Sequence, residues 1–387
     1  MTLPRDPWFW PALFAAFSMA VLFVDGLRGA RSLRRLHDVP PVPDAEAPPA
    51  SVVIAARNEE RNIEHALASV LAQRYGLLEV VVVDDRSTDS TGAILDRMAA
   101  ANPRLRVVHV TDLPPGWLGK NHALHVGAAE ARGEYLLFTD ADVVMEPDTL
   151  ARAVGHMRAE RLDHAAAGPR VELPSLPLRV FVVLFTLFFA IAFRPWKVRD
   201  PRSPAHIGVG AFNLVRAEAY RAAGGHQPIR MRPDDDLKLG KLMKKHGFRQ
   251  DFLVATESIR VEWYRTFGEL VRGLMKNGFA GVDYRVWFVV AATVAQLLVF
   301  VLPWVAVWFT GGAAQLLFGA AVAMAFVMYA GAARGQEVSP LYGVFFPVAT
   351  LAFLYIVWRA TVVTLANDGI DWRGTHYALD ELRANEV

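Results

Sequence analysis

The 387-residue sequence contains no cysteine, which excludes disulfides, a thiolate nucleophile and cysteine-ligated zinc. It also lacks an excess of charge of either sign. Its 41 Lys and Arg against 39 Asp and Glu give a net charge of +2, so no nucleic-acid partner is expected. Two phosphate-binding loops are missing as well, namely a G-x-G-x-x-G after the first strand-like run and a Walker lysine loop. A bound nucleotide must therefore be held by other groups.

Hydrophobic residues are abundant, at 53% of the chain, and they are unevenly spread. Trp8 to Leu27 is an apolar run interrupted only near its end by Asp25, and it is about long enough to span a bilayer. Without a basic leader or a small-residue cleavage site, it is expected to be an uncleaved anchor. By the positive-inside rule, the arginines that follow stay in the cytoplasm and residue 1 faces outward; they are Arg28, Arg31, Arg34 and Arg35.

Three further apolar runs near the other end, 286–309, 313–333 and 341–366, are each long enough to cross. The sequence thus predicts a multi-pass protein of a bacterial inner membrane, with one N-terminal and about three C-terminal spans. One span before the polar region and three after it place the tail outside. If the tail instead supports the polar region, one C-terminal segment is re-entrant or the first run does not cross. The expected segments are an anchor with its basic flank (1–36), a proline-rich linker (37–50), a cytoplasmic catalytic domain (51–285), a transmembrane bundle (286–366) and a tail (367–387).

The run Val180 to Phe193 is wholly apolar except for Thr186. At about 14 residues it is short for a span, so it is expected to lie in the membrane interface. Crossing would also separate Asp142 from the later Asp cluster at 234–236. The alternative is a helix of the protein core.

Strand-like and helix-like patterns alternate through residues 51–285, which predicts an α/β fold with a doubly wound sheet. Asn58 is expected to cap the helix that follows the first strand. Carboxylates follow two of the expected strands, and in such sheets ligands bind at the carboxyl ends of the strands. The alternative is that these are only turn-forming aspartates. The expected strands are Ser51–Ala55, Val80–Val83, Arg106–Val110 and Tyr135–Thr139, and the carboxylates are Asp84, Asp85, Asp140 and Asp142.

Six ordered segments together resemble the membrane-anchored family 2 glycosyltransferases of the GT-A fold. They read AARNEE, VVVDDRSTDST, GKNHAL, FTDADVVMEPDTL, GVGAFNLVRAEAYRAAGGH and DDDLKLGKLMKKHGF. A W-R-G-x-x-Y tail is similar to that of carotenoid- and hopanoid-associated members. The resemblance implies a mixed-sheet GT-A domain beside the membrane helices, which binds a nucleotide sugar.

The resemblance also assigns roles to residues. The exit loop of the first strand contacts the nucleotide through Ala55, Arg57 and Glu59. Asp84, the first carboxylate after the second strand, accepts a hydrogen bond from the nucleobase. Asp85 lies beside it in the nucleotide site. Lys120 approaches the diphosphate. In the D-x-D, Asp140 faces the ribose and shares the metal with Asp142. Because carboxylate oxygens are hard ligands, the metal is expected to be Mg²⁺ or Mn²⁺.

The segment RPDDDLKLGKLMKKHG resembles the family's E-D-x-x-L segment, which places the catalytic base at Asp236. Asp235 is the second choice and Asp234 the third, while an acidic first turn of the helix 237–246 is the structural alternative. The base takes the proton of an acceptor hydroxyl as its oxygen attacks the sugar, in one inverting step. The expected donor is a UDP-linked sugar and the expected acceptor is a membrane lipid or another amphiphile.

Processive polysaccharide synthases of this family carry Q-x-x-R-W near residues 262–276, and this chain does not, so transfer of a single sugar is expected. The residues found there can contact phosphates or lipid headgroups, or form a solvated helix face; they are Glu262, Arg265, Arg272 and Lys276. Alternatives are a processive synthase, a sugar nucleotidyltransferase, and a non-catalytic membrane scaffold or transporter subunit with a degenerate transferase domain.

Overall fold

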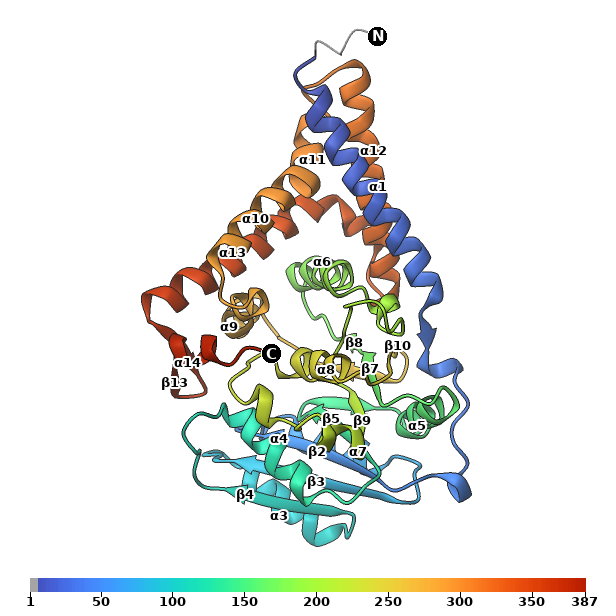
Figure 1. The fold of residues 1–387 in the computed structure, drawn as a ribbon, viewed down its shortest axis with the longest axis vertical. Helices are drawn as coiled ribbons and strands as arrows, with labels where there is room; N and C mark the ends of the chain where they lie inside the picture. The colour runs from blue at the N-terminus through green and yellow to red at the C-terminus, as the bar shows by residue number, and fades with distance from the viewer. Residues whose placement is uncertain (1–5) are drawn as a thin grey trace. The chain divides into compact units, whose positions relative to one another are not determined.

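The computed structural model describes residues 6–387, so the prediction that residue 1 faces outward lies outside the described residues. The chain divides into two compact units. A helical unit contains residues up to 32, 173–194 and 264–374, and a sheet unit contains 33–172, 195–263 and 375–387 (Figure 1). The segment boundaries expected from the sequence stay predictions.

The sheet unit is built on an eight-stranded sheet in the order β1-β10-β7-β9-β5-β2-β3-β4. All neighbours pair in parallel except β9, which is antiparallel to both β5 and β7. The sheet is therefore mixed, as the GT-A resemblance implies. Its strands are β1 Arg34–Arg35, β2 Ala50–Ala56, β3 Leu78–Asp85, β4 Leu105–Val110, β5 Tyr135–Asp140, β7 His164–Gly168, β9 Asn213–Arg216 and β10 Gln250–Val254. A second sheet joins β6 Val143–Met145, β11 Ile259–Val261 and β8 Arg170–Val171.

The central strands are apolar on both faces because helices cover the sheet, and the side chains of Val80 to Val83 are fully buried. Register places Ala55 opposite Asp140, and Ala56 opposite Asp84. The carboxyl ends of β2, β3 and β5 therefore meet at one edge of the sheet. The helices of this unit are α2 Ile63–Leu71, α3 Thr91–Ala101, α4 Gly119–Glu130, α5 Thr149–Ala159, α7 Ala217–Ala222, α8 Asp235–Lys245 and α14 Leu379–Ala384, and β13 Thr375–Ala378 precedes the last.

The expectation that Asn58 caps the first helix is wrong, because α2 begins only at Ile63. Asn58 has a left-handed φ of 54°, and its side-chain oxygen accepts a hydrogen bond from the Thr88 amide at 2.8 Å. The amide of Glu59 donates to Oγ1 of Thr91 at 2.8 Å. The segment after β2 is thus a loop fastened to the segment after β3.

The helical unit has five helices long and apolar enough to cross a membrane among residues 6–387: 9–32, 176–197, 286–306, 312–335 and 340–366. One is N-terminal and three are C-terminal. Many of their apolar side chains are exposed, which is typical of a lipid-facing surface. The elements are α1 Phe9–Ser32, α6 Leu176–Phe193, α9 Phe267–Gly278, α10 Val286–Gln296, a π-helical turn Leu297–Val301, α11 Leu302–Ala306, α12 Gly312–Gly335, η7 Pro340–Phe345, α13 Phe346–Ala366 and β12 Gly369–Trp372.

Helix α6 begins at Leu176 and has 18 residues, so it is longer than the run of about 14 that the sequence marks. Its length alone therefore does not prevent it from crossing. The strands on either side of it, β8 and β9, both belong to the sheet unit, and its interfacial position stays a prediction.

Candidate active site

A lysine joins two of the predicted carboxylates at the carboxyl edge of the sheet. Lys120 lies in the first turn of α4, Asp140 ends β5, and Asp235 opens α8. The ammonium Nζ of Lys120 is 2.8 Å from Oδ1 of Asp140 and 3.4 Å from Oδ2 of Asp235. One pocket contains all three residues together with Asp236, Gly210 and six others: Leu124, Phe138, Thr139, Asn213, His226 and Leu239.

The carboxylate of Asp236 is held by backbone amides. Its Oδ2 accepts from the Gly210 amide at 2.7 Å, and its Oδ1 accepts from the Leu237 amide at 2.8 Å. Burial, followed by the negative charge of Asp235, raises the pKa of Asp236 to about 7. The side chain is thus fixed in orientation and titrates near neutral pH.

Position 210 requires glycine because its backbone lies close to the carboxylate of Asp140. A β-carbon at this position would lie 2.6 Å from Oδ2 of Asp140, so a side chain there would push that carboxylate away. The glycine therefore lets one backbone segment hold Asp236 and leave room for Asp140.

Asp234 is occupied differently from its two neighbours. Its Oδ1 and Oδ2 accept from Nε and a terminal nitrogen of Arg232 at 2.9 and 3.1 Å, and Lys238 lies 3.7 Å away. Arg232 is only 2% exposed. Because a buried guanidinium needs a partner, Asp234 serves as the counter-ion of Arg232.

The ammonium of Lys120 is protonated at neutral pH. Burial lowers its pKa, but the carboxylates of Asp140, Asp235 and Asp236 outweigh that effect and raise the pKa above its ordinary value. A fixed positive charge therefore lies at the edge where β5 ends.

A second group of the predicted residues surrounds Asp85 at the end of β3. Nε and a terminal nitrogen of Arg86 donate to its two oxygens at 2.7 and 3.0 Å, and Arg57 lies 3.7 Å from Oδ2. Oδ2 also packs against Gly119, where a β-carbon would lie 2.5 Å away. Asp85 thus connects the exit loop of β2 with the start of α4, next to Lys120.

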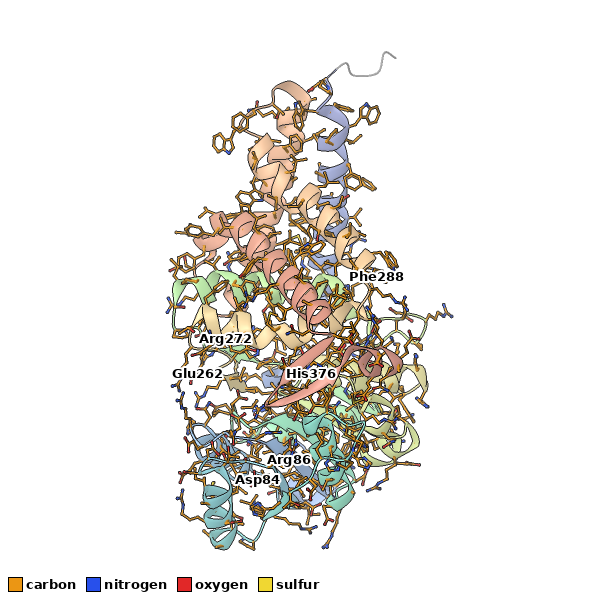
Figure 2. All side chains as sticks on the ribbon, turned by 90° about the vertical axis from the view of Figure 1, so that its left-hand side faces the viewer. Asp84, Arg86, Glu262, Arg272, Phe288 and His376 are labelled. Atoms are coloured by element: carbon orange, nitrogen blue, oxygen red, sulfur yellow. The ribbon has the colours of Figure 1, made fainter. Side chains whose placement is uncertain are left out.

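Asp84 is in contact with a histidine, His109, that the sequence did not indicate as a site residue. Its Oδ2 lies 3.0 Å from Nδ1 of His109, and its Oδ1 accepts from the Ser87 amide at 3.3 Å. Asp84 and Arg86 lie near each other in the sheet unit (Figure 2). Ala55, which the sequence placed in the exit loop, lies within β2 and is opposite Asp140 in register.

The residues at the D-x-D fit a divalent cation only in part. Burial, and then the charges of Asp140 and Glu59, raise the pKa of Asp142 to about 7, while Lys120 opposes the shift. Residues 6–387 nevertheless hold no group of three or more His, Asp or Glu that could ligate a metal. Two carboxylates fit an Mg²⁺ or Mn²⁺ ion that takes its other ligands from water and a bound phosphate.

The C-terminal tail adds a residue to the site that sequence reasoning missed. The hydroxyl oxygen of Tyr377 accepts from the Gly119 amide at 3.3 Å. Farther along, Oδ1 of Asn385 accepts from the Met231 amide and its Nδ2 donates to the Pro228 carbonyl, both at 2.9 Å. Tyr377 is the tyrosine of W-R-G-x-x-Y, and that motif was the signal that could have found it.

The chain is similar to known proteins in three respects: a family model, two named relatives and a solved structure. Residues 51–223 match the sequence model of the family described as Glycosyl transferase family 2. The chain carries a family 2 glycosyltransferase domain. The 4,4'-diaponeurosporenoate glycosyltransferases of Staphylococcus aureus strains MRSA252 and USA300 are each 25% identical over 238 residues, which are 60% of this chain and 58% of those proteins. A mannosyltransferase from Pyrobaculum calidifontis, solved in complex with GDP-Man and Mn²⁺, matches 91% of this chain and 99% of its own, with a TM-score of 0.56 and 22% identity.

The family 2 domain confirms the resemblance stated from the motifs, the glycosyltransferase class and the mixed GT-A-like fold. The matched segment includes the D-x-D, Lys120 and the carboxylates after β3, but ends before Asp235 and Asp236. The roles of individual residues stay predictions. The chain spans 58% of the length of the S. aureus relatives, so their activity is only a proposal for this chain.

Proposed function

We propose that the protein transfers one sugar from a nucleotide diphosphate sugar to a lipid or other amphiphilic acceptor, with inversion and with help from a divalent metal. The carrying observation is the position of Lys120, whose ammonium lies 2.8 Å from Asp140 and 3.4 Å from Asp235 in one pocket. That arrangement supports a donor diphosphate and a general base at the same edge of the sheet.

In the proposed reaction the acceptor hydroxyl oxygen forms a bond to the anomeric carbon, the bond from that carbon to the diphosphate breaks, and Asp236 takes the hydroxyl proton. A pKa of about 7 suits Asp236 to this task near neutral pH. Lys120 supplies positive charge to the leaving diphosphate, and Asp84 and Asp85 hold the nucleoside side of the donor. Mg²⁺ or Mn²⁺, shared by Asp140 and Asp142, neutralises charge on the phosphates when it is bound.

The partners are inferred from the membrane helices and the relatives. The name of the S. aureus relatives supports a lipid-like acceptor. We expect UDP as the nucleotide, but the P. calidifontis structure contains GDP-Man, so both donor types belong in the test. The arginines after α1 support catalysis on the cytoplasmic side of a bacterial inner membrane.

The test is donor hydrolysis and transfer by full-length protein in nanodiscs, with UDP- and GDP-linked sugars, Mn²⁺ or Mg²⁺, and a lipid extract. We expect turnover that chelation abolishes and that Asp142→Ala lowers at least 100-fold, while the exposed Asp112→Ala stays active. No turnover by wild-type protein with any donor would support the non-catalytic scaffold. A product ladder on a gel would support a processive synthase.

A further inference from the structure

Helices α1 and α12 run parallel to each other. Near their N-terminal ends, Ala12 belongs to an apolar cluster with Ala314 and Phe318. Near their C-terminal ends, a β-carbon on Gly26 would lie 3.8 Å from Cε of Met328. The contacts advance in the same direction along both helices, which lie side by side over their length (Figure 1). If both helices cross a bilayer, their C-terminal ends are on the same side of it.

The C-terminal end of α1 is on the side that holds the sheet unit. Ser32 ends the helix, and Arg34 and Arg35 directly after it form β1, which pairs with β10. Because α12 is parallel to α1, it also ends on that side, at Gly335.

The tail returns to the same side. Tyr377 and Asn385 are hydrogen-bonded to residues of the sheet unit, namely Gly119, Pro228 and Met231. The segment between α12 and the tail therefore begins and ends on one side of the bilayer. It contains one helix long enough to cross, and a single crossing would put its two ends on opposite sides.

The packing of α13 agrees with a turn back rather than a new crossing. Gly343, just before α13, lies against Phe326 and Tyr329, which are well inside α12. The ring of Phe346 stacks on Trp304 of α11 with 6.1 Å between centroids and 12° between planes. The chain thus reverses along α12 before α13 begins.

One face of α13 carries an exposed apolar stripe at helical spacing. Its members are Val348 (61% exposed), Leu351 (48%), Tyr355 (54%), Val362 (57%) and Leu365 (42%). Arg359 is exposed at the same spacing, between Tyr355 and Val362. An arginine in the middle of such a stripe suits a helix in the interface, where its guanidinium reaches headgroups or water.

We propose that α13 does not cross the membrane but lies in the leaflet on the side of the sheet unit, with this stripe against lipid acyl chains. The C-terminal crossings are then two: residues 286–306 outward from the sheet unit and α12 back. The bend between them, with Trp308 80% and Phe309 82% exposed, faces the opposite side. The inference rests on the membrane association of the apolar helices and does not depend on the transfer reaction.

Because the chain has no cysteine, the first test is single-cysteine labelling of the full-length protein in membranes. Thr310→Cys marks the bend, Ser339→Cys the end of α12, Asn367→Cys the end of α13, and Asp112→Cys the sheet unit as reference. With an impermeant maleimide on sealed inside-out and right-side-out vesicles, positions 339, 367 and 112 should react from one side and 310 from the other. Reaction of 339 and 367 from opposite sides would overturn the proposal.

A depth measurement provides the second test. Val348→Cys, Tyr355→Cys and Val362→Cys, each carrying an environment-sensitive fluorophore, are quenched by lipids brominated at known depths. An in-plane helix predicts the same depth at all three positions. A crossing helix predicts a steady change of about 21 Å from position 348 to 362, because each residue rises about 1.5 Å. A steady change of that size would contradict the assignment.

Discussion

The hydroxyl oxygen of Tyr377 accepts a hydrogen bond from the amide of Gly119 at 3.3 Å, across 258 positions of sequence. Gly119 directly precedes Lys120, the residue that we propose faces the donor diphosphate. The tail therefore contacts the first turn of α4, whose conformation sets the position of that charge. Tyr377 is a positioning residue in this view, because it acts through Gly119 and Lys120.

We expect Tyr377→Phe to raise the KM for the nucleotide sugar about three- to tenfold, since a net hydrogen bond contributes roughly 0.5–1.5 kcal/mol. The unfolding temperature should change little, because the ring stays in place. Tyr75→Phe is the matched control, since its buried hydroxyl donates to the Pro48 carbonyl away from the site. That control should keep the wild-type KM. An unchanged KM in Tyr377→Phe would refute the positioning role.

Substitution by asparagine should lower mainly kcat at Asp236 and mainly the stability of the fold at Asp234. Asp236→Asn keeps a similar shape but cannot take a proton, so we expect kcat to fall about 10²- to 10⁴-fold. Its loss of stability should be smaller than that of Asp234→Asn, because only one backbone amide loses its acceptor. Asp234→Asn leaves Arg232 buried without its counter-ion, which typically costs about 3–5 kcal/mol. Turnover per folded molecule should then persist. Steady-state kinetics together with thermal unfolding of both variants separates the two roles, and a reversed pattern would move the base to Asp234.

The pH dependence of transfer should follow Asp236. Its pKa is raised from 3.8 to about 7, so the base becomes active as the pH rises through about 7. The stability has the opposite sign. A carboxyl group with a raised folded pKa binds more protons when folded, so its contribution falls as the pH rises from about 4 to 7. Kinetics and metal-free thermal unfolding from pH 5 to 9 measure both slopes. Asp236→Asn should reduce the stability slope and leave the part that comes from Asp142, whose pKa is also raised to about 7.

The central strands could be predicted because their burial is written in the sequence. A run of apolar residues such as Val80 to Val83 is buried only if helices cover both faces of the sheet. The aspartates at the ends of β3 and β5 then place carboxylates at one edge of the sheet. The antiparallel β9 could not be predicted in the same way. It has only four residues, Asn213–Arg216, and its direction is set by pairing with β5 and β7 rather than by local pattern.

Contacts between distant segments explain the other differences. Asn58 has the side chain of a helix cap, yet its oxygen accepts from the Thr88 amide in the loop after β3, and α2 begins only at Ile63. Hydropathy marks α13 as apolar but does not reveal that Tyr377 returns to Gly119. Counting spans leaves the side of the tail open, whereas the bond of Tyr377 to Gly119 and the parallel packing of α1 and α12 support the re-entrant alternative.

His109 bridges two carboxylates, with Nδ1 3.0 Å from Asp84 and Nε2 2.9 Å from Asp96. The bond to Asp96 raises the pKa of His109 above its ordinary 6.5; burial opposes this and the bond to Asp84 supports it. A raised histidine pKa adds stability below about pH 6.5 that is lost as the pH rises through the folded value. His109→Gln should therefore lower the unfolding temperature at pH 5.5 more than at pH 8.5, whereas His65→Gln, at an exposed position, should lower it equally at both pH values.

Because protonated His109 also bonds to Asp84, the affinity for nucleotide measured by calorimetry should weaken at pH 5.5 in the wild-type protein and weaken less in His109→Gln. Equal pH dependence in both proteins would show that His109 does not control Asp84.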